Sequence, residues 1–323
     1  MKLTIKLSHL KIWDGNYLLQ SPLSSSKWGE TTFQIQNSEK ECNFWVIHEG
    51  ISEMETANCP KENCILIIGE EKSKKQYDPE YLAQFGALIS TRTDLQHPRI
   101  LSWHYICPWH LHKSYDQLKA LQSLPKGRTL STICSDEAGL EGHKKRFAFT
   151  NKMIGHFKDR LDVFGKGFNY IPDKYDGLAP YRYSIAIENS VHTDYWTEKL
   201  TDCYLSLTMP IYYGCPNVTD YFPAESLIRI DLDDYAGSIR IIEEAIESDR
   251  YTQNLGSLLK ARDLVLDNYQ IFPALLSCLS KNQNLFSPQS KGSTLIKPER
   301  FFQKGFTQAR IKNKLNRIFK KRS

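Results

Sequence analysis

The sequence predicts an α/β protein with two domains, each built around a parallel sheet. Its 323 residues exceed the size that one hydrophobic core usually supports, so two domains are expected. In the first half, short apolar runs alternate with polar stretches and with a helical pattern at 80–85. These runs span residues 3–7, 33–35, 44–47, 65–68 and 87–89. In the second half, a strand, a helix and a strand follow one another between residues 183 and 213, as a parallel α/β unit requires.

The boundary between the two domains is predicted near residue 127. The stretch 123–128, SLPKGR, combines proline and glycine with polar residues and interrupts regular structure. The apolar run 129–135 that follows is expected to form the first strand of a second sheet. Further elements are expected at 146–161 (helix), 227–230 (strand) and 238–246 (helix). The predicted organisation is an N-terminal domain at 1–127, a C-terminal domain at 128–290 and a basic tail at 291–323.

Composition and cysteine usage indicate a folded protein of the cytoplasm. Hydrophobic residues at 41% and charged residues at 24% are ordinary for globular domains, so neither a disordered nor a fibrous chain is expected. The N-terminus lacks the features of a signal peptide, and no apolar run is long enough to span a membrane. The eight cysteines are therefore expected to be reduced thiols, and none has the spacing of metal ligands.

Polar residues gather where the strand predicted at 183–187 ends. Glu188-Asn189-Ser190 closes this apolar run, and ligands bind at the carboxyl ends of parallel strands. Thr193 or Asp194 is expected to cap the helix that follows.

That helix is predicted to have one apolar face and one charged face. Tyr195, Glu198 and Lys199 are spaced i, i+3 and i+4, so they are expected to share a face at the positive end of the helix dipole, where an anion would bind. The apolar face is predicted from the spacing of Leu200, Cys203, Tyr204 and Leu207.

These residues resemble the signature of glycosyltransferase family 10, the α1,3/α1,4-fucosyltransferases. The matching elements are Ile187-Glu188-Asn189-Ser190, Tyr195-Trp196-Thr197-Glu198-Lys199 and Pro210-Ile211-Tyr212-Tyr213-Gly214, in the order and spacing of the family. The resemblance is specific over about 129–235 and looser over 61–110, and Trp196 stands where a small aliphatic residue is commoner. It implies the GT-B fold, in which two Rossmann-like domains face each other across a cleft.

In that family the C-terminal domain binds the sugar nucleotide, which implies a donor-binding set here. Lys199 and Arg146 are expected at the pyrophosphate, Glu198 at the ribose and Tyr195 at the nucleotide. Glu188 and Asn189 are expected beside the sugar. From the residues alone, Lys199 can be a solvated lysine, Arg146 part of a basic helix face with Lys144 and Lys145, and Asn189 a turn former.

A general base is predicted in the N-terminal domain. The buried run 64–68 ends in Gly69-Glu70, which places a carboxylate at the carboxyl edge of the first sheet. The family's catalytic glutamate follows a comparable strand and glycine, so Glu70 is the candidate. Glu71 and a solvated turn are the alternatives. Direct attack assisted by this base would invert the anomeric centre.

Two other groups have competing interpretations. Asp231-Leu232-Asp233 resembles a metal-binding motif of other glycosyltransferases but is interpreted as a loop or helix cap, so neither a metal nor another cofactor is expected. Trp103, His104 and Trp109 are candidates for contacting the acceptor sugar, with buried packing as the alternative.

The basic tail is predicted to be an interfacial helix. Residues 297–323 contain ten Lys or Arg and one acidic residue, Glu299. Apolar residues recur in it at helical spacing at Ile311, Leu315, Ile318 and Phe319. This pattern favours an anionic membrane surface, which would make the protein peripheral at the inner face of the cytoplasmic membrane. A solvated tail or a nucleic-acid contact is the alternative, but no nucleic-acid-binding fold accompanies it.

The function predicted from these observations is an inverting transfer of L-fucose from GDP-fucose to an acceptor oligosaccharide, in polysaccharide biosynthesis, O-antigen synthesis or protein glycosylation. The acceptor would be lipid-linked if the tail binds the membrane. Two alternatives remain open. The same scaffold can use a different nucleotide sugar, or the chain can be a binding protein for carbohydrate or nucleotide that lacks catalysis.

Overall fold

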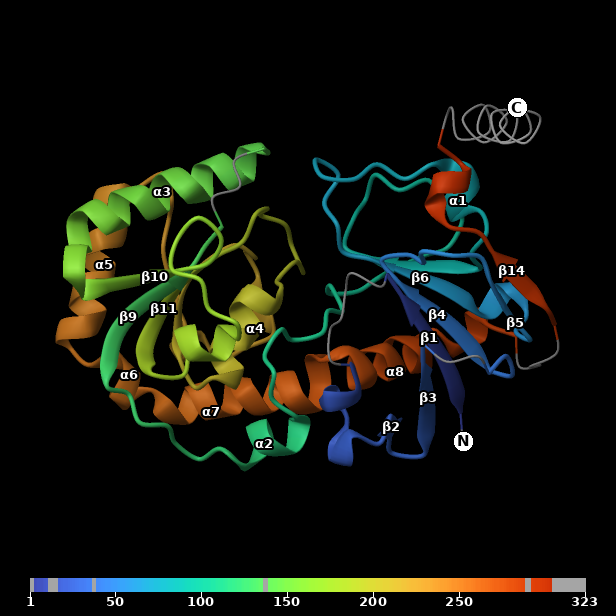
Figure 1. Cartoon of the computed structure of the whole chain (residues 1–323), viewed down its shortest axis with the longest axis horizontal. Helices are drawn as coiled ribbons and strands as arrows, with labels where there is room; N and C mark the ends of the chain where they lie inside the picture. Colours follow the sequence, from blue (N-terminus) through green and yellow to red (C-terminus); the bar gives the residue numbers. More distant parts are fainter. Residues whose placement is uncertain (1–2, 11–16, 37–38, 136–138, 288–291, 304–323) are drawn as a thin grey trace, which may run out of the picture. The chain divides into compact units, whose positions relative to one another are not determined.

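The computed structural model describes residues 3–10, 17–36, 39–135, 139–287 and 292–303. The chain divides into two compact units (Figure 1). The first unit contains the described residues of 1–14, 29–102 and 282–323. The second contains those of 15–28 and 103–281.

This division differs from the boundary predicted near residue 127. Residues 103–127 group with the second unit because Trp109, Leu111 and Leu118 belong to its hydrophobic core. The break in sequence pattern at 123–128 thus directly precedes the strand Arg128–Ile133, which lies inside this unit, and does not separate two domains. The tail predicted at 291–323 also contributes a strand to the first unit, whereas its predicted helical residues at 311–319 lie outside the described residues.

The first unit contains a parallel sheet, as the sequence predicts. Its strands are ordered β3-β1-β4-β6-β7-β8. They are β1 (Thr4–His9), β3 (Thr31–Ile35), β4 (Phe44–His48), β6 (Cys64–Ile68), β7 (Ala87–Ser90) and β8 (Ile100–Ser102). The helix predicted at 80–85 is a single turn, α1 (Pro79–Leu82). A separate antiparallel pair joins β5 (Glu55–Ala57) to β14 (Thr294–Ile296).

The second unit contains a five-stranded parallel sheet in the order β10-β9-β11-β12-β13. Its strands are β9 (Arg128–Ile133), β10 (Leu161–Phe164), β11 (Tyr181–Ile187), β12 (Met209–Tyr213) and β13 (Ile228–Arg229). The chain moves outward from β9 to β10 and then returns to β11 on the other side of β9. Open α/β sheets bind ligands at such a reversal of strand order.

Helices complete the second unit, and Figure 1 shows α5 to the left of its sheet and α4 to the right. The helices are α2 (Tyr115–Ala120), α3 (Glu141–Phe157), α4 (Glu198–Leu205), α5 (Tyr235–Glu247), α6 (Arg250–Gln253), α7 (Leu255–Leu264) and α8 (Ile271–Lys281). Strand β2 (Lys27–Trp28) lies in the segment 15–28. The buried side of α4 contains Leu200, Cys203 and Tyr204, as predicted. None of the described helices has both the length and the apolar character needed to cross a membrane.

Candidate functional site

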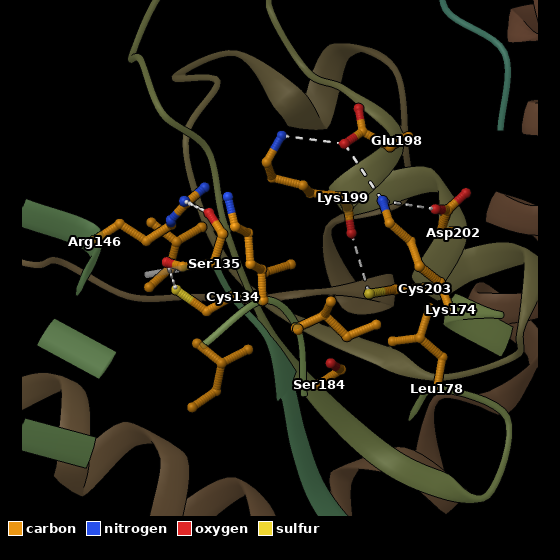
Figure 2. A pocket seen from close by; sticks show the side chains of 16 residues that line it. Cys134, Ser135, Arg146, Lys174, Leu178, Ser184, Glu198, Lys199, Asp202 and Cys203 are labelled. Carbon is orange, nitrogen blue, oxygen red and sulfur yellow. Dashed lines mark hydrogen bonds and ion pairs between the residues drawn. The ribbon is translucent and has the colours of Figure 1, made fainter. Parts of the chain in front are cut away.

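A pocket of about 240 Å³ lies in the second unit, at the carboxyl ends of β9, β10 and β11 (Figure 2). It therefore occupies the position where the strand order reverses. One part of its wall is apolar and contains Ile133, Leu178, Ile185 and Ala186. The charged residues in the lining are Arg146, Lys166, Lys174, Glu198, Lys199 and Asp202. Cations outnumber carboxylates in this lining, so an anionic ligand suits it.

A buried carboxylate anchors the N-terminus of α4 beside this pocket. Thr197 is the N-cap, and its side chain accepts a hydrogen bond from the Lys199 backbone N–H. The Glu188 carboxylate accepts bonds from the Thr197 N–H and from its hydroxyl, both at 2.8 Å. Burial raises the pKa of Glu188, while the Lys199 ammonium, with its Nζ 3.6 Å from Glu188 Oε2, opposes this effect. Glu188 therefore fixes the position of the helix that carries Glu198 and Lys199.

The cap predicted at Thr193 or Asp194 is wrong. Asp194 adopts a φ of +64°, and its carboxylate accepts bonds from the Asn217 amide and the Tyr221 hydroxyl. Because α4 begins only at Glu198, Tyr195 precedes the helix and does not share its first turn with Glu198 and Lys199. Instead, the Tyr195 ring is buried and stacks on Tyr105 at a centroid distance of 6.2 Å.

Two lysines flank the partly buried Glu198 carboxylate (Figure 2). Lys199 Nζ lies 3.3 Å and Lys174 Nζ 3.5 Å from Glu198 Oε1. Burial alone would raise the pKa of Glu198, but Lys199 and Lys174 outweigh it and hold that pKa well below its ordinary value. Burial alone would likewise lower the pKa of Lys199, but Glu198 and Glu188 raise it. Lys199 is therefore a charged ammonium at neutral pH.

Asp202 lies one helical turn beyond Glu198 and is also paired with Lys174. Its side chain is almost fully buried, and its Oδ2 lies 3.5 Å from Lys174 Nζ. Its Oδ1 accepts a bond from the His110 backbone N–H at 3.1 Å. Burial outweighs the pairing and raises the pKa of Asp202 to about 7.

Arg146 lies on α3, on the opposite side of the pocket from Lys174 and Asp202 (Figure 2). Its guanidinium donates to Asn189 Oδ1 and to Ser135 Oγ. Its Nε is buried and has no hydrogen-bond partner among the described residues. Two neutral groups, the Asn189 amide and the Ser135 hydroxyl, thus hold the guanidinium in place.

The neighbouring lysines of α3 lie outside the lining of this pocket in the described structure. Lys144 pairs with Glu141, and Lys145 pairs with Asp233. Of the three cations at 144–146, Arg146 thus lines the pocket, whereas the two lysines pair with carboxylates outside it.

The remaining candidates have other surroundings. Glu70 lies in the first unit, directly after β6 and Gly69, and accepts a bond from Lys74 Nζ at 2.8 Å. The ring of His104 is buried and stacks on Trp196 at 4.8 Å, and Trp109 is buried in the core of the second unit. Their surroundings correspond to the packing alternative. Trp103 is half-buried, with Lys281 Nζ 5.4 Å from its ring centroid.

The segment Asp231-Leu232-Asp233 follows β13 as a loop, in agreement with its interpretation from the sequence. Asp231 accepts from the Asp233 N–H, and Asp234 caps α5. Within the described part of the chain, no three His, Cys, Asp or Glu side chains are grouped as a metal site would require. All eight cysteines are buried free thiols.

Sequence reasoning missed Lys174 and Asp202. Lys174 begins a short 3-10 helix, Lys174–Gly177, that precedes β11, and only the folding of this segment onto α4 brings it to Glu198. Asp202 carries a signal that was available, since it follows Glu198 at i+4 and so lies on the same side of the helix.

Comparison with known proteins finds similarity in the part of the chain that contains this pocket. Residues 126–247 match the model of the glycosyltransferase family 10 (fucosyltransferase) C-terminal domain. An α-(1,3)-fucosyltransferase FucT of Helicobacter pylori is 32% identical over 85 residues, which are 26% of this chain and 16% of the relative. An α-(1,3)-fucosyltransferase 4 of Bos taurus is 39% identical over 79 residues, or 22% of this chain and 20% of the relative.

The alignments thus span about a fifth or less of these curated relatives. Among solved structures, an α1,3-fucosyltransferase with GDP superimposes with a TM-score of 0.49 at 18% identity, covering 84% of this chain and 93% of that one. The matched residues 126–247 include β9 to α5 and every charged residue in the lining of the pocket. Residues 126–247 are thus similar to the C-terminal domain of glycosyltransferase family 10, the fucosyltransferases.

Proposed function

We propose that the protein is an inverting glycosyltransferase that moves L-fucose from GDP-fucose to a hydroxyl of an acceptor glycan, with α1,3 linkage as in its relatives. The observation that supports this most is the placement of Arg146 and Lys199 around one pocket. Glu198 lies between Lys199 and Lys174 in the same pocket. That pocket lies wholly within the residues that match the fucosyltransferase domain. The glycan is proposed to be a surface polysaccharide or an O-antigen precursor.

In this proposal the pocket binds the nucleotide diphosphate. Lys199 lies in the first turn of α4, where its ammonium and the helix dipole both favour a phosphate. Arg146 offers a planar fork of donors to the diphosphate from the other side. Glu198 accepts from the ribose hydroxyls. Tyr195 and Asn189 complete the donor side, and Glu188 supports it through Thr197.

The chemical step then needs one base and no covalent enzyme intermediate. The Glu70 carboxylate removes the proton of the acceptor hydroxyl as the hydroxyl oxygen attacks C1 of fucose. The bond between C1 and the β-phosphate oxygen breaks, and GDP leaves with the bonding electron pair. Attack on the face opposite to the leaving group inverts C1. Arg146 and Lys199 stabilise the charge that develops on the diphosphate, so the proposal requires no metal.

The acceptor is proposed to reach the enzyme at an anionic membrane surface. The basic residues of 297–323 would supply the attraction, and a lipid-linked oligosaccharide would be the acceptor. Of the aromatic candidates Trp103, His104 and Trp109, only Trp103 is half-buried, and it remains our candidate for contacting the acceptor sugar.

Calorimetry of donor binding tests the proposal. The ligands are GDP-fucose, GDP-mannose, UDP-galactose and GDP, and the proteins are the wild type, Lys199→Ala and Lys144→Ala. Lys144 is the matched control, because its side chain is 58% exposed and pairs with Glu141 outside the pocket. Loss of a charge-assisted bond to phosphate costs about 1.5–3 kcal/mol, so Lys199→Ala should bind GDP-fucose about 10–150-fold more weakly.

Each result has a distinct meaning. Preference for another nucleotide sugar would overturn fucose as the donor, and absence of nucleotide binding would overturn the enzyme assignment. If GDP-fucose binds, transfer of radiolabelled fucose to candidate glycans follows, with Glu70→Gln as the variant expected to bind donor and lack transfer.

A further inference from the structure

The loop that carries Glu70 is tied at both ends to one buried carboxylate. Glu49 directly follows β4 and is 1% exposed. Its Oε1 accepts from the Gly69 backbone N–H at 2.6 Å, at the start of the loop. Its Oε2 accepts from the Tyr77 hydroxyl at 3.3 Å, at the end of the loop. The two carboxylate oxygens of Glu49 therefore bind both ends of the segment 69–77 and hold them at a fixed distance from each other.

A buried arginine holds the same loop from within. Arg92 is 8% exposed and follows β7. Its Nη1 donates to the backbone carbonyl of Glu70 at 2.9 Å and to that of Lys75 at 2.8 Å. Its Nε and Nη2 donate to the two carboxylate oxygens of Asp94, at 2.9 and 2.8 Å. Four donor contacts thus join the guanidinium to two points of the loop and to an adjacent carboxylate.

The strands on either side extend this attachment. The Ser90 hydroxyl donates to the carbonyl of Ile68, the last residue of β6, and accepts from the Arg92 backbone N–H. The Glu49 N–H donates to the carbonyl of Ile67. The loop is therefore connected to β4, β6 and β7, three neighbouring strands of the first sheet.

Burying the charges of Glu49 and Arg92 beside this loop costs free energy, which is explained if the loop needs a defined shape. A charge that is removed from water must be fully hydrogen-bonded to be tolerated, and surface turns ordinarily form without buried charges. The salt bridge from Glu70 to Lys74 does not explain the arrangement, because Lys74 is 51% exposed and exposed pairs contribute little. The Glu70 carbonyl oxygen that Arg92 contacts is two bonds from the Cα that carries the candidate base.

We infer that Glu49 and Arg92 are positioning residues for Glu70. They hold the backbone of 69–77 so that the Glu70 carboxylate keeps one place relative to the sheet edge. This inference rests on the proposed function, in which Glu70 accepts the acceptor proton. A displacement of about 1 Å in such a group is sufficient to cost about 100-fold in rate.

The test measures loop order and catalysis separately. The variants are Arg92→Ala, Arg92→Lys and Tyr77→Phe. Arg99→Ala is the matched control in the same unit, since its guanidinium donates to the Leu285 carbonyl instead. Hydrogen exchange of the 69–77 amides, kcat and KM for the donor, and GDP affinity by calorimetry are measured for each variant.

For Arg92→Ala we expect faster exchange in 69–77 and a fall in kcat of about 10–100-fold. The donor KM and the GDP affinity should stay within about twofold of wild type, because the donor residues lie in the second unit. Arg92→Lys keeps one charged donor and should recover part of kcat. Tyr77→Phe removes a single hydroxyl and should give a smaller fall with the same unchanged GDP affinity.

Three outcomes would overturn the inference. The first is an unchanged kcat in Arg92→Ala despite faster exchange in the loop. The second is equal loss of kcat and GDP affinity in all three variants, which would indicate general destabilisation. The third is full activity of Glu70→Gln, which would overturn the base itself and thereby separate failure of the proposed function from failure of the positioning role.

Discussion

Asp202→Asn should stabilise the protein increasingly as the pH rises. In the folded state, burial raises the pKa of Asp202 from its ordinary value of 3.8 to about 7. Between these values the unfolded chain releases the proton first, so the folded state binds more protons and the free energy of unfolding falls with rising pH. Each factor of ten in proton affinity corresponds to about 1.4 kcal/mol, which gives a loss of about 4 kcal/mol by neutral pH.

The side chain of asparagine does not titrate and therefore does not incur this loss. The free energy of unfolding of Asp202→Asn minus that of wild type should rise by about 4 kcal/mol between about pH 4 and about pH 7, and then level off. Urea unfolding across this range measures it. The comparison cancels His104 and His110, whose pKa values burial lowers to about 4 and which destabilise both proteins as the pH falls below about 6.5. Asp263→Asn, at a side chain that is 43% exposed, controls for loss of a charge.

A difference that falls as the pH rises would refute this reasoning. It would mean that Lys174, 3.5 Å away, stabilises the ionised carboxylate more than burial penalises it. A difference that does not change with pH would show that Asp202 has the same proton affinity in both states.

Two further substitutions test the backbone around the pocket. Thr197→Ala removes the cap of α4 and the hydroxyl that donates to the buried Glu188, while the backbone N–H of residue 197 still donates to it. Urea unfolding should therefore show a loss of about 2–4 kcal/mol, whereas Thr197→Ser should retain most of the stability. An unchanged midpoint in the alanine variant would contradict the role of Thr197. Gly142→Ala places a Cβ against the Asn189 carbonyl oxygen, closer than van der Waals contact allows, so calorimetric unfolding should show a loss of about 1–3 kcal/mol. Gly155 lies on the same helix, and a Cβ added there would have no neighbouring atom within 4 Å. Gly155→Ala should therefore raise the free energy of unfolding by about 0.5–1 kcal/mol. Equal effects at both glycines would contradict the close approach at Gly142.

The strands of both sheets were predictable because buried parallel strands appear as short continuous apolar runs. The strand predicted at 183–187 is β11, and the run predicted at 65–68 is β6. The presence of helix α4 could be predicted, but the residue at which it begins could not. Thr193, Asp194 and Thr197 are all capping residue types. The choice among them depends on the Glu188 carboxylate, which binds Thr197 from nine positions earlier in the chain.

The site was predictable only as far as its local motifs extend. Arg146 and Lys199 line one pocket, although they are 53 residues apart in sequence. Lys174 could not be found, because no pattern near it indicates that the segment 174–177 folds against Glu198. The division into units was missed for the same reason. Gln20 donates to the Trp109 carbonyl across 89 positions, which places an early segment in the second unit.

The pairing of β14 with β5 has a consequence for synthesis of the chain. Residues 103–281 of the second unit are contiguous, so they can begin to fold while the ribosome is still adding the C-terminal residues. The edge of β5 must wait for Thr294–Ile296, which are translated more than 230 positions later. Until then its unpaired backbone groups are open to other strands, which is a recognised route to aggregation. A nascent chain that stalls before β14 should therefore need a chaperone on its first unit even when its second unit is already folded.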